Sequence, residues 1–150
     1  MSGFVRYQSG YALSVGTTNT LSALGYSTKR ANYIGGETTG VTNPRDFEPS
    51  RDRYLNAAAF GIPGQFELGN LAPALDWLRG FTAKVEALQF GKVTKVSERV
   101  DLTLGLDLSN PFNFHRWRDP ATNINDSLNF GRVTSALEGR ALQISAKITF

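Results

Sequence analysis

The chain has no cysteine in its 150 residues and one histidine, His115. The lack of cysteine excludes disulfide frameworks, thiolate metal sites and cysteine nucleophiles. The sequence also has no G-x-S-x-G and no H-E-x-x-H motif, so the partners that His115 would need in a serine or zinc hydrolase are missing. We therefore expect no enzymatic activity, no metal site and no cofactor, and we interpret His115 as a loop or interface residue.

Long hydrophobic runs are also missing. No stretch approaches the roughly 18 consecutive apolar residues of a membrane helix. The N-terminal residues MSGFVRYQSGYALSVG lack a basic region followed by a continuous apolar run, so they do not match a secretory signal. A helical membrane protein is excluded, whereas a membrane β-barrel stays open, because its strands need only ~9–11 residues with one apolar face.

The chain has no block of basic residues. Its 16 Lys and Arg against 13 Asp and Glu give a formal net charge of +3, and the two signs are interspersed. A nucleic-acid-binding surface requires clustered positive charge, so we expect no nucleic-acid partner. With 41% hydrophobic and 19% charged residues, the composition favours an ordered chain with a sizeable core over disorder.

The strongest pattern that is present is period-two alternation of apolar and polar residues, which is typical of β-strands. It predicts four strands, near residues 4–16, 83–94, 99–109 and 140–150. The third is the clearest, with apolar Leu102, Leu104, Leu106 and Leu108 against Asp101, Thr103, Gly105 and Asp107. One side of each such strand is therefore apolar and the other polar or small.

The second strand is the least regular of the four. Leu88 and Phe90 fall on the face opposite Val85 and Ala87, which predicts a bulge or a shifted boundary. The segment TKVSER that follows this strand is expected to be a short polar turn leading into the third strand.

The remaining connections are long. Residues 16–82 and 109–139 are rich in Gly, Asn, Pro and Thr, and PALDWLRGF (73–81) is expected to hold one helical turn at most. Loops of this length are uncommon in compact soluble domains and are usually functional. A short turn at one end of the strands and long loops at the other end is the asymmetry of outer-membrane barrels.

Alternation alone leaves two architectures open, namely a soluble β-sandwich or small barrel acting as a binding module, and a membrane β-barrel. The apolar faces stay aliphatic for ~9–10 residues, about the height of a bilayer core. Aromatic residues gather where such strands would meet the interfaces, as at Phe112, Phe114, Trp117 and Phe150. Four strands also leave edges that lipid does not tolerate, so they belong to a larger barrel. We predict an all-β, antiparallel, up-and-down transmembrane β-barrel with long extracellular loops.

An ordered set of segments resembles a known family. The segments are AAAFGIPGQFELGN (57–70), WLRGF (77–81), SERV (97–100), LSNPFNFHRWRDPATNIN (108–125), NFGRVTSA (129–136) and RALQISAKITF (140–150). Together they resemble the C-terminal end of TonB-dependent outer-membrane receptors, in the branch whose N-terminus carries a carboxypeptidase-regulatory-like domain. The resemblance covers residues 10–150, and it implies that the chain is one C-terminal barrel segment with no separate second domain.

The resemblance implies a function and a location. Receptors of this family import a scarce solute across the outer membrane of Gram-negative-type bacteria, with energy delivered through TonB. The implied partners are outer-membrane lipid, the barrel-assembly machinery, and the remaining strands and plug of the receptor. Contact with TonB is expected through an N-terminal part that, like the signal peptide, TonB box and plug, lies outside this chain.

The last strand has a further implied role. In this family, a terminal aromatic residue preceded by alternating apolar residues is the signal that the assembly machinery recognises. The matching positions here are Leu142, Ile144, Ala146, Ile148 and Phe150. An exposed strand edge is a template for an added strand, which suits such a role. The alternative is that Phe150 is an interfacial anchor, and the two roles can coexist.

Two groups of polar residues are weaker candidates. Asp101, Asp107 and Lys147 fall on the polar side of their strands, so they are expected to face the barrel lumen, either on a solute path or as solvated wall. Oxygen-bearing side chains also cluster at Asp119, Asn123, Asn125 and Asp126. They lack the ordered spacing and closing glutamate of a calcium loop, so we interpret them as turn-forming residues.

Overall fold

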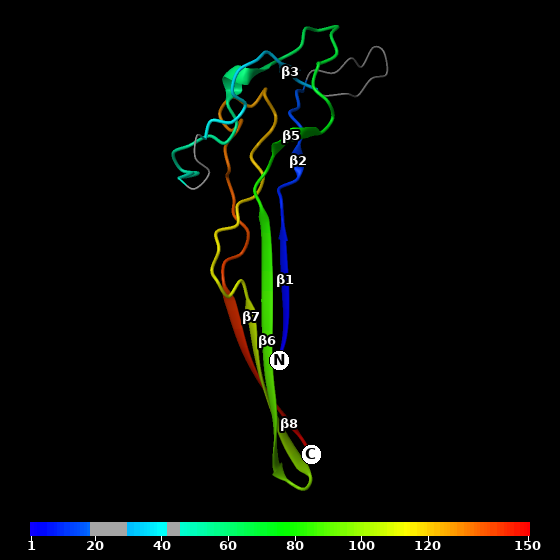
Figure 1. Ribbon diagram of the computed structural model, residues 1–150, viewed down its shortest axis with the longest axis vertical. Coiled ribbons are helices and arrows are strands. Elements are labelled where there is room, and N and C mark those ends of the chain that lie inside the picture. The colour runs from blue at the N-terminus through cyan, green and yellow to red at the C-terminus, as the bar shows by residue number, and fades with distance from the viewer. Residues whose placement is uncertain (19–29, 42–45) are drawn as a thin grey trace. The chain divides into compact units, whose positions relative to one another are not determined.

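The computed structural model describes residues 1–18, 30–41 and 46–150 (Figure 1). Contacts divide the chain into two units. The sheet unit comprises Met1–Gln8, Thr82–Arg116 and Leu137–Phe150, and the loop unit comprises Ser9–Phe81 and Trp117–Ala136. Within the described ranges, no helix is both long enough and apolar enough to cross a membrane. Residues 19–29 and 42–45, which belong to the first long connection, lie outside the description.

The sheet unit is a four-stranded antiparallel sheet (Figure 1). Its strands are β1 (Ser2–Gln8), β6 (Ala83–Ser97), β7 (Val100–Ser109) and β8 (Ala141–Thr149). Their order in the sheet, β1-β6-β7-β8, is also their order in the chain, and each strand is antiparallel to its neighbours. The all-β, antiparallel, up-and-down arrangement predicted from the sequence is confirmed. The sheet keeps two edges, β1 and β8, and these four strands do not close into a barrel by themselves.

One face of β7 and β8 is aliphatic. Residues directly opposite each other on antiparallel strands share a face. The register pairs β7 with β8 as Leu102 with Ile148, Leu104 with Ala146, Leu106 with Ile144, and Leu108 with Leu142. These side chains are not covered by protein, since Leu104 is 45% and Ile144 75% exposed. A continuous aliphatic surface of this kind requires an apolar medium against it.

The structure corrects the expected irregularity in the second strand and the expected turn. β6 pairs with β7 in unbroken register up to Lys95, and the register shifts only between Lys95 and Ser97. The strand therefore continues through most of TKVSER, and the turn is Glu98–Arg99. At 15 residues β6 exceeds the ~9–11 needed to cross a bilayer core. On β6 the face of Leu88 also carries Lys84, Glu86 and Lys92, which disturbs the sequence pattern.

The first strand is shorter than the expected range of 4–16. β1 ends at Gln8, and the chain then enters the loop unit, where Leu13 and Val15 are buried. A Cβ atom at Gly10 would lie 1.9 Å from the carbonyl oxygen of Gly80, an approach that only glycine allows. Leu13 and Val15, which continue the alternation past Gln8, are therefore buried in the loop unit and are not part of strand β1.

The loop unit has its own hydrophobic core. It contains β2 (Ala12–Leu13) paired with β5 (Leu75–Arg79), β3 (Asn32–Tyr33) paired with β4 (Phe60–Gly61), and a 3₁₀ helix, η2 (Ala57–Ala59). The core consists of Leu13, Val15, Ala31, Leu55, Ala59, Phe60, Leu71, Leu75, Leu78 and Phe130. The segment 73–81 therefore forms strand β5 rather than a helical turn. Its two buried leucines meet the core, whereas the residues between them are exposed.

Contacts between distant segments hold the loop unit together. Gly131 adopts φ +74°, and a Cβ atom there would lie 2.4 Å from the carbonyl oxygen of Leu55. The Gly131 carbonyl accepts from the backbone N–H of Tyr54 at 2.6 Å. Burial and the nearby Asp119 carboxylate raise the pKa of Tyr54, whose ring packs 4.6 Å from that of Phe81.

The topology predicts which residues are reached from outside the cell. Both long connections leave the sheet at the end opposite the Glu98–Arg99 turn, so they are expected outside and the turn in the periplasm. Since the chain has no cysteine, Gln65→Cys and Glu98→Cys in the assembled barrel give single labelling sites in this segment. A membrane-impermeant maleimide should label position 65 on intact cells and position 98 only after lysis. Labelling of position 98 on intact cells would reverse the topology.

Candidate functional site

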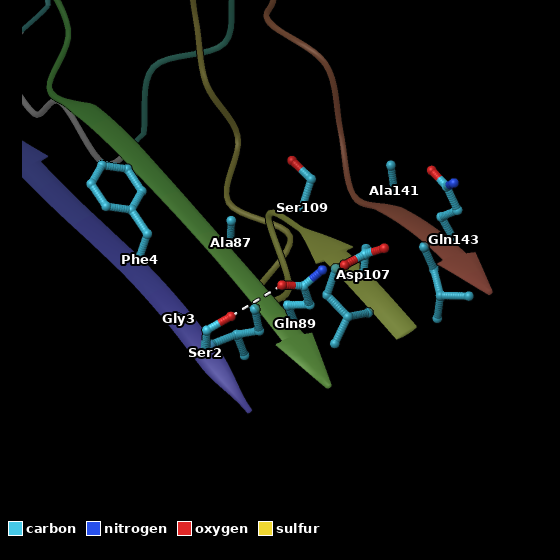
Figure 2. Close-up of a pocket in the computed structure, with 12 residues that line it drawn as sticks. Ser2, Gly3, Phe4, Ala87, Gln89, Asp107, Ser109, Ala141 and Gln143 are labelled. Atoms are coloured by element: carbon cyan, nitrogen blue, oxygen red, sulfur yellow. Dashed lines mark hydrogen bonds between the residues drawn. The ribbon is translucent and has the colours of Figure 1, made fainter. Parts of the chain in front are cut away.

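The polar face of the sheet carries a row of hydrogen-bonding side chains. The register places Ser2, Gln89, Asp107 and Gln143 opposite one another across all four strands. The Ser2 hydroxyl donates to Oε1 of Gln89 at 3.2 Å (Figure 2). The next row toward the long loops consists of Phe4, Ala87, Ser109 and Ala141. Together the two rows form a strip that is polar in one row, whereas the other row has small side chains on β6, β7 and β8 and Phe4 on β1.

A hollow of about 670 Å³ is lined by the residues of these two rows and by their neighbours Gly3, Leu88, Leu108 and Leu142. Figure 2 shows the residues that line it. The small side chains of Ala87, Ser109 and Ala141 leave room above the middle and last strands. The carboxylate of Asp107 and the amides of Gln89 and Gln143 border that room. These groups accept and donate hydrogen bonds, whereas Phe4 and three leucines make the rest of the lining largely apolar.

Two rows toward the turn from Ser109, the polar face has almost no side chains. Gly91, Gly105 and Ser145 lie opposite one another on β6, β7 and β8. A Cβ atom at Gly105 would lie 2.5 Å from the Ser145 hydroxyl, so this hydroxyl takes the space that the glycine leaves. At Gly91, where a Cβ atom would meet only the Leu104 carbonyl oxygen at 3.9 Å, the backbone is open to close approach.

All three residues expected at the lumen lie on the polar face. Asp107 belongs to the row with Gln89 and Gln143, whereas Asp101 lies opposite Thr149 and Lys147 opposite Thr103, in neighbouring rows. The structure thus brings Asp101 and Lys147 together but separates Asp107 from them. That this face lines a lumen stays a prediction.

Sequence reasoning missed Ser2 and Gln89 as members of the polar row. Gln89 lies between Leu88 and Phe90, so alternation alone is enough to place it on the face opposite to theirs. Ser2 carries no such signal, because its place beside Gln89 follows from the register between β1 and β6.

The residues of the expected assembly signal lie on and after β8. Leu142, Ile144, Ala146 and Ile148 share the aliphatic face. Phe150 follows the strand and is 96% exposed. Since β8 is an edge of the sheet, this row remains available to a further strand. Its recognition by an assembly machinery stays a prediction.

The oxygen-rich cluster makes hydrogen bonds within turns and one to a distant segment. Oδ1 of Asn125 accepts from the Thr17 hydroxyl at 2.6 Å, and Oδ1 of Asn123 accepts from the Asn125 backbone at 3.1 Å. Asp126 accepts from both the backbone and the side chain of Asn129, and these bonds lower the pKa of Asp126. The hydrogen bonds of Asn123 and Asp126 to residues nearby in the chain support their interpretation as turn-forming residues. His115, the one histidine of the sequence, lies in the connection that follows β7.

A comparison with protein families identifies the class. Residues 1–143 match the model of the outer membrane beta barrel domain. The chain belongs to this family, and it is an outer-membrane protein whose sheet is part of a β-barrel. The match decides against the soluble sandwich or small barrel that alternation had left open. Searches of curated proteins and of solved structures found no match.

The two faces of β7 allow a test of which one meets lipid. Leu106 and Asp107 are neighbours in the chain and lie on opposite faces. Leu106→Arg in the assembled barrel should lower the free energy of unfolding by roughly 2–4 kcal/mol, as for arginine near the bilayer centre. Asp107→Arg, which introduces the same side chain one position away, should change it by less than about 1 kcal/mol if this face is wet.

Urea titration of the barrel in lipid vesicles measures both effects. Equal losses for the two variants would contradict a water-filled space on the polar face.

Proposed function

We propose that the chain is the C-terminal barrel segment of a TonB-dependent receptor that imports a scarce solute across the outer membrane. The observation that carries the proposal is the architecture. An up-and-down sheet of the outer-membrane barrel family has both long connections at one end, and those connections form a packed unit of their own. Long loops that leave one end of a barrel suit capture of a ligand, since binding residues concentrate in loops held by a rigid scaffold.

Two further features support this function. The free edges of β1 and β8 require additional strands, because unpaired backbone groups are costly in lipid. The hollowed polar face, with its glycine and serine row, suits a barrel wall that a plug or a solute approaches closely. No enzymatic step belongs to this proposal, in which the chain is a wall and a binding surface.

Binding to TonB tests the receptor proposal. The complete receptor, purified in detergent, should bind the periplasmic domain of TonB in a pull-down or calorimetric titration. The same protein reduced to residues 1–150 should not bind, since contact with TonB is expected through the N-terminal part. A complete protein that does not bind TonB under conditions where a known receptor does would contradict the proposal.

The second part of the proposal is that β8 with Phe150 serves as the assembly signal. Recognition acts on the unpaired strand, whereas in the finished barrel Phe150 contributes at most about 1.5–3 kcal/mol, as for any large apolar side chain. Deleting Phe150, or changing it to a polar residue, should therefore reduce the amount of folded barrel much more than it lowers the stability of barrel already assembled.

Leu104→Ala is the matched control, because it removes apolar area from the centre of β7 without changing the end of β8. Heat-modifiable gel mobility reports the folded barrel for both variants. Equal losses of folded barrel for the Phe150 variants and Leu104→Ala would mean that Phe150 acts only as an interfacial anchor.

A further inference from the structure

Two aromatic side chains lie side by side on the surface of the loop unit. Tyr33 belongs to β3, and Trp77 belongs to β5. Trp77 is 53% exposed and Tyr33 39% exposed. Their ring centroids are 5.7 Å apart and their planes meet at 52°. The rings therefore form an angled corner with accessible faces, which a tightly stacked pair would not offer.

The two rings separate two hollows. One, of about 540 Å³, is lined by Tyr33 and Trp77 with Gly36, Glu37, Thr38, Thr39 and Val41. The other, of about 420 Å³, is lined by the same two rings with Asn70, Leu71, Ala72 and Leu75. A ligand in the larger hollow contacts aromatic rings and the polar residues Glu37, Thr38 and Thr39, whereas the smaller hollow is mostly apolar and has Asn70 as its polar residue. Apolar walls with a few polar groups are the usual composition of a small-molecule site.

Hydrogen bonds hold the corner in place. The Tyr33 hydroxyl donates to the Gly36 carbonyl at 2.9 Å, which fixes the ring against the turn. The Tyr33 N–H donates to Oδ1 of Asn70 at 2.7 Å, and Nδ2 of Asn70 donates back to the Tyr33 carbonyl at 3.1 Å. The side chain of Asn56 donates to the Glu37 carbonyl at 2.9 Å. Because the site is preorganised, a ligand would lose little free energy in ordering it.

The charge of the lining is negative. Glu37 contributes a carboxylate to the larger hollow, and no lysine or arginine among the described residues lines either hollow. The Glu37 side chain is exposed, and within the described part of the chain it has no hydrogen bond or ion pair. Among the residues that the structure describes, an anionic ligand would find no positive partner in either hollow, whereas a cation would find both a carboxylate and aromatic faces.

We propose that Trp77, Tyr33 and Glu37 form a binding site for an organic cation of the quaternary ammonium class. The negative face of an aromatic ring attracts such a cation, and tryptophan does so most strongly. The Glu37 carboxylate adds a Coulombic attraction from the same hollow. An inorganic metal ion is a poor fit, since the described residues hold no group of three or more ligating side chains. A neutral sugar would stack on the rings of Tyr33 and Trp77 but would gain no Coulombic attraction from the Glu37 carboxylate.

Binding of choline to the assembled barrel in detergent tests this site by isothermal titration calorimetry. The control ligand is 3,3-dimethyl-1-butanol, the neutral carbon isostere of choline, which should bind at least about tenfold more weakly. Trp77→Ala should weaken choline binding by roughly three- to thirtyfold, and Trp77→Phe, which keeps an aromatic face, should weaken it less. Glu37→Gln should also weaken choline binding and reduce its dependence on salt.

Phe66→Ala is the matched control variant, since Phe66 is 78% exposed in the same unit and lines neither hollow. It should leave choline binding unchanged. Three outcomes would overturn the proposal: no choline binding, equal binding of the neutral isostere, or binding of maltose that Trp77→Ala abolishes and Glu37→Gln leaves unchanged. None of these measurements requires TonB or transport, so the site and the receptor proposal succeed or fail separately.

Discussion

Hydrogen bonding between the backbones of neighbouring strands is the interaction on which the structure of this chain depends. In the bilayer core no water is available, so each peptide group needs a partner in an adjacent strand. β6 pairs with β1 over Ala83–Gln89 and with β7 over Ala87–Ser97, so it has partners on both sides only at Ala87–Gln89. The same ladder determines which side chains meet lipid, because a one-residue slip would exchange the leucines of β7 with Asp101 and Asp107.

Alternation predicts the strands best where a strand lies mostly within the bilayer. The leucines of β7 and the apolar residues of β8 alternate throughout, and both strands agree with the expected ranges to within about two residues. β6 disturbs the pattern because Lys84, Glu86 and Lys92 share a face with Leu88, and Lys92 lies opposite Leu104. In β1 the pattern continues past the strand, since Leu13 is apolar for a different reason, namely burial in the loop unit.

The loop unit and the polar row were beyond sequence reasoning because both depend on contacts between distant residues. Gly10 meets Gly80, and Gly131 meets Leu55, without any periodic signal in the chain. Alternation places Asp107 and Gln143 on the polar side, but their alignment with Ser2 requires the register of three strand pairs. Turn-forming residues were easier to predict from the sequence, because Asn123 and Asp126 make hydrogen bonds to residues only a few positions away.

The two units gain their stability from different sources. The aliphatic face of the sheet unit is exposed in the protein itself and is stabilised by lipid, whereas the loop unit buries leucine, valine and phenylalanine side chains in its own core. The entropy cost of closing a loop grows only slowly with its length, so a barrel tolerates a long connection if that connection packs. The buried side of β5 supplies this packing through Leu75 and Leu78, and its outer side is then free to present Trp77 to a ligand.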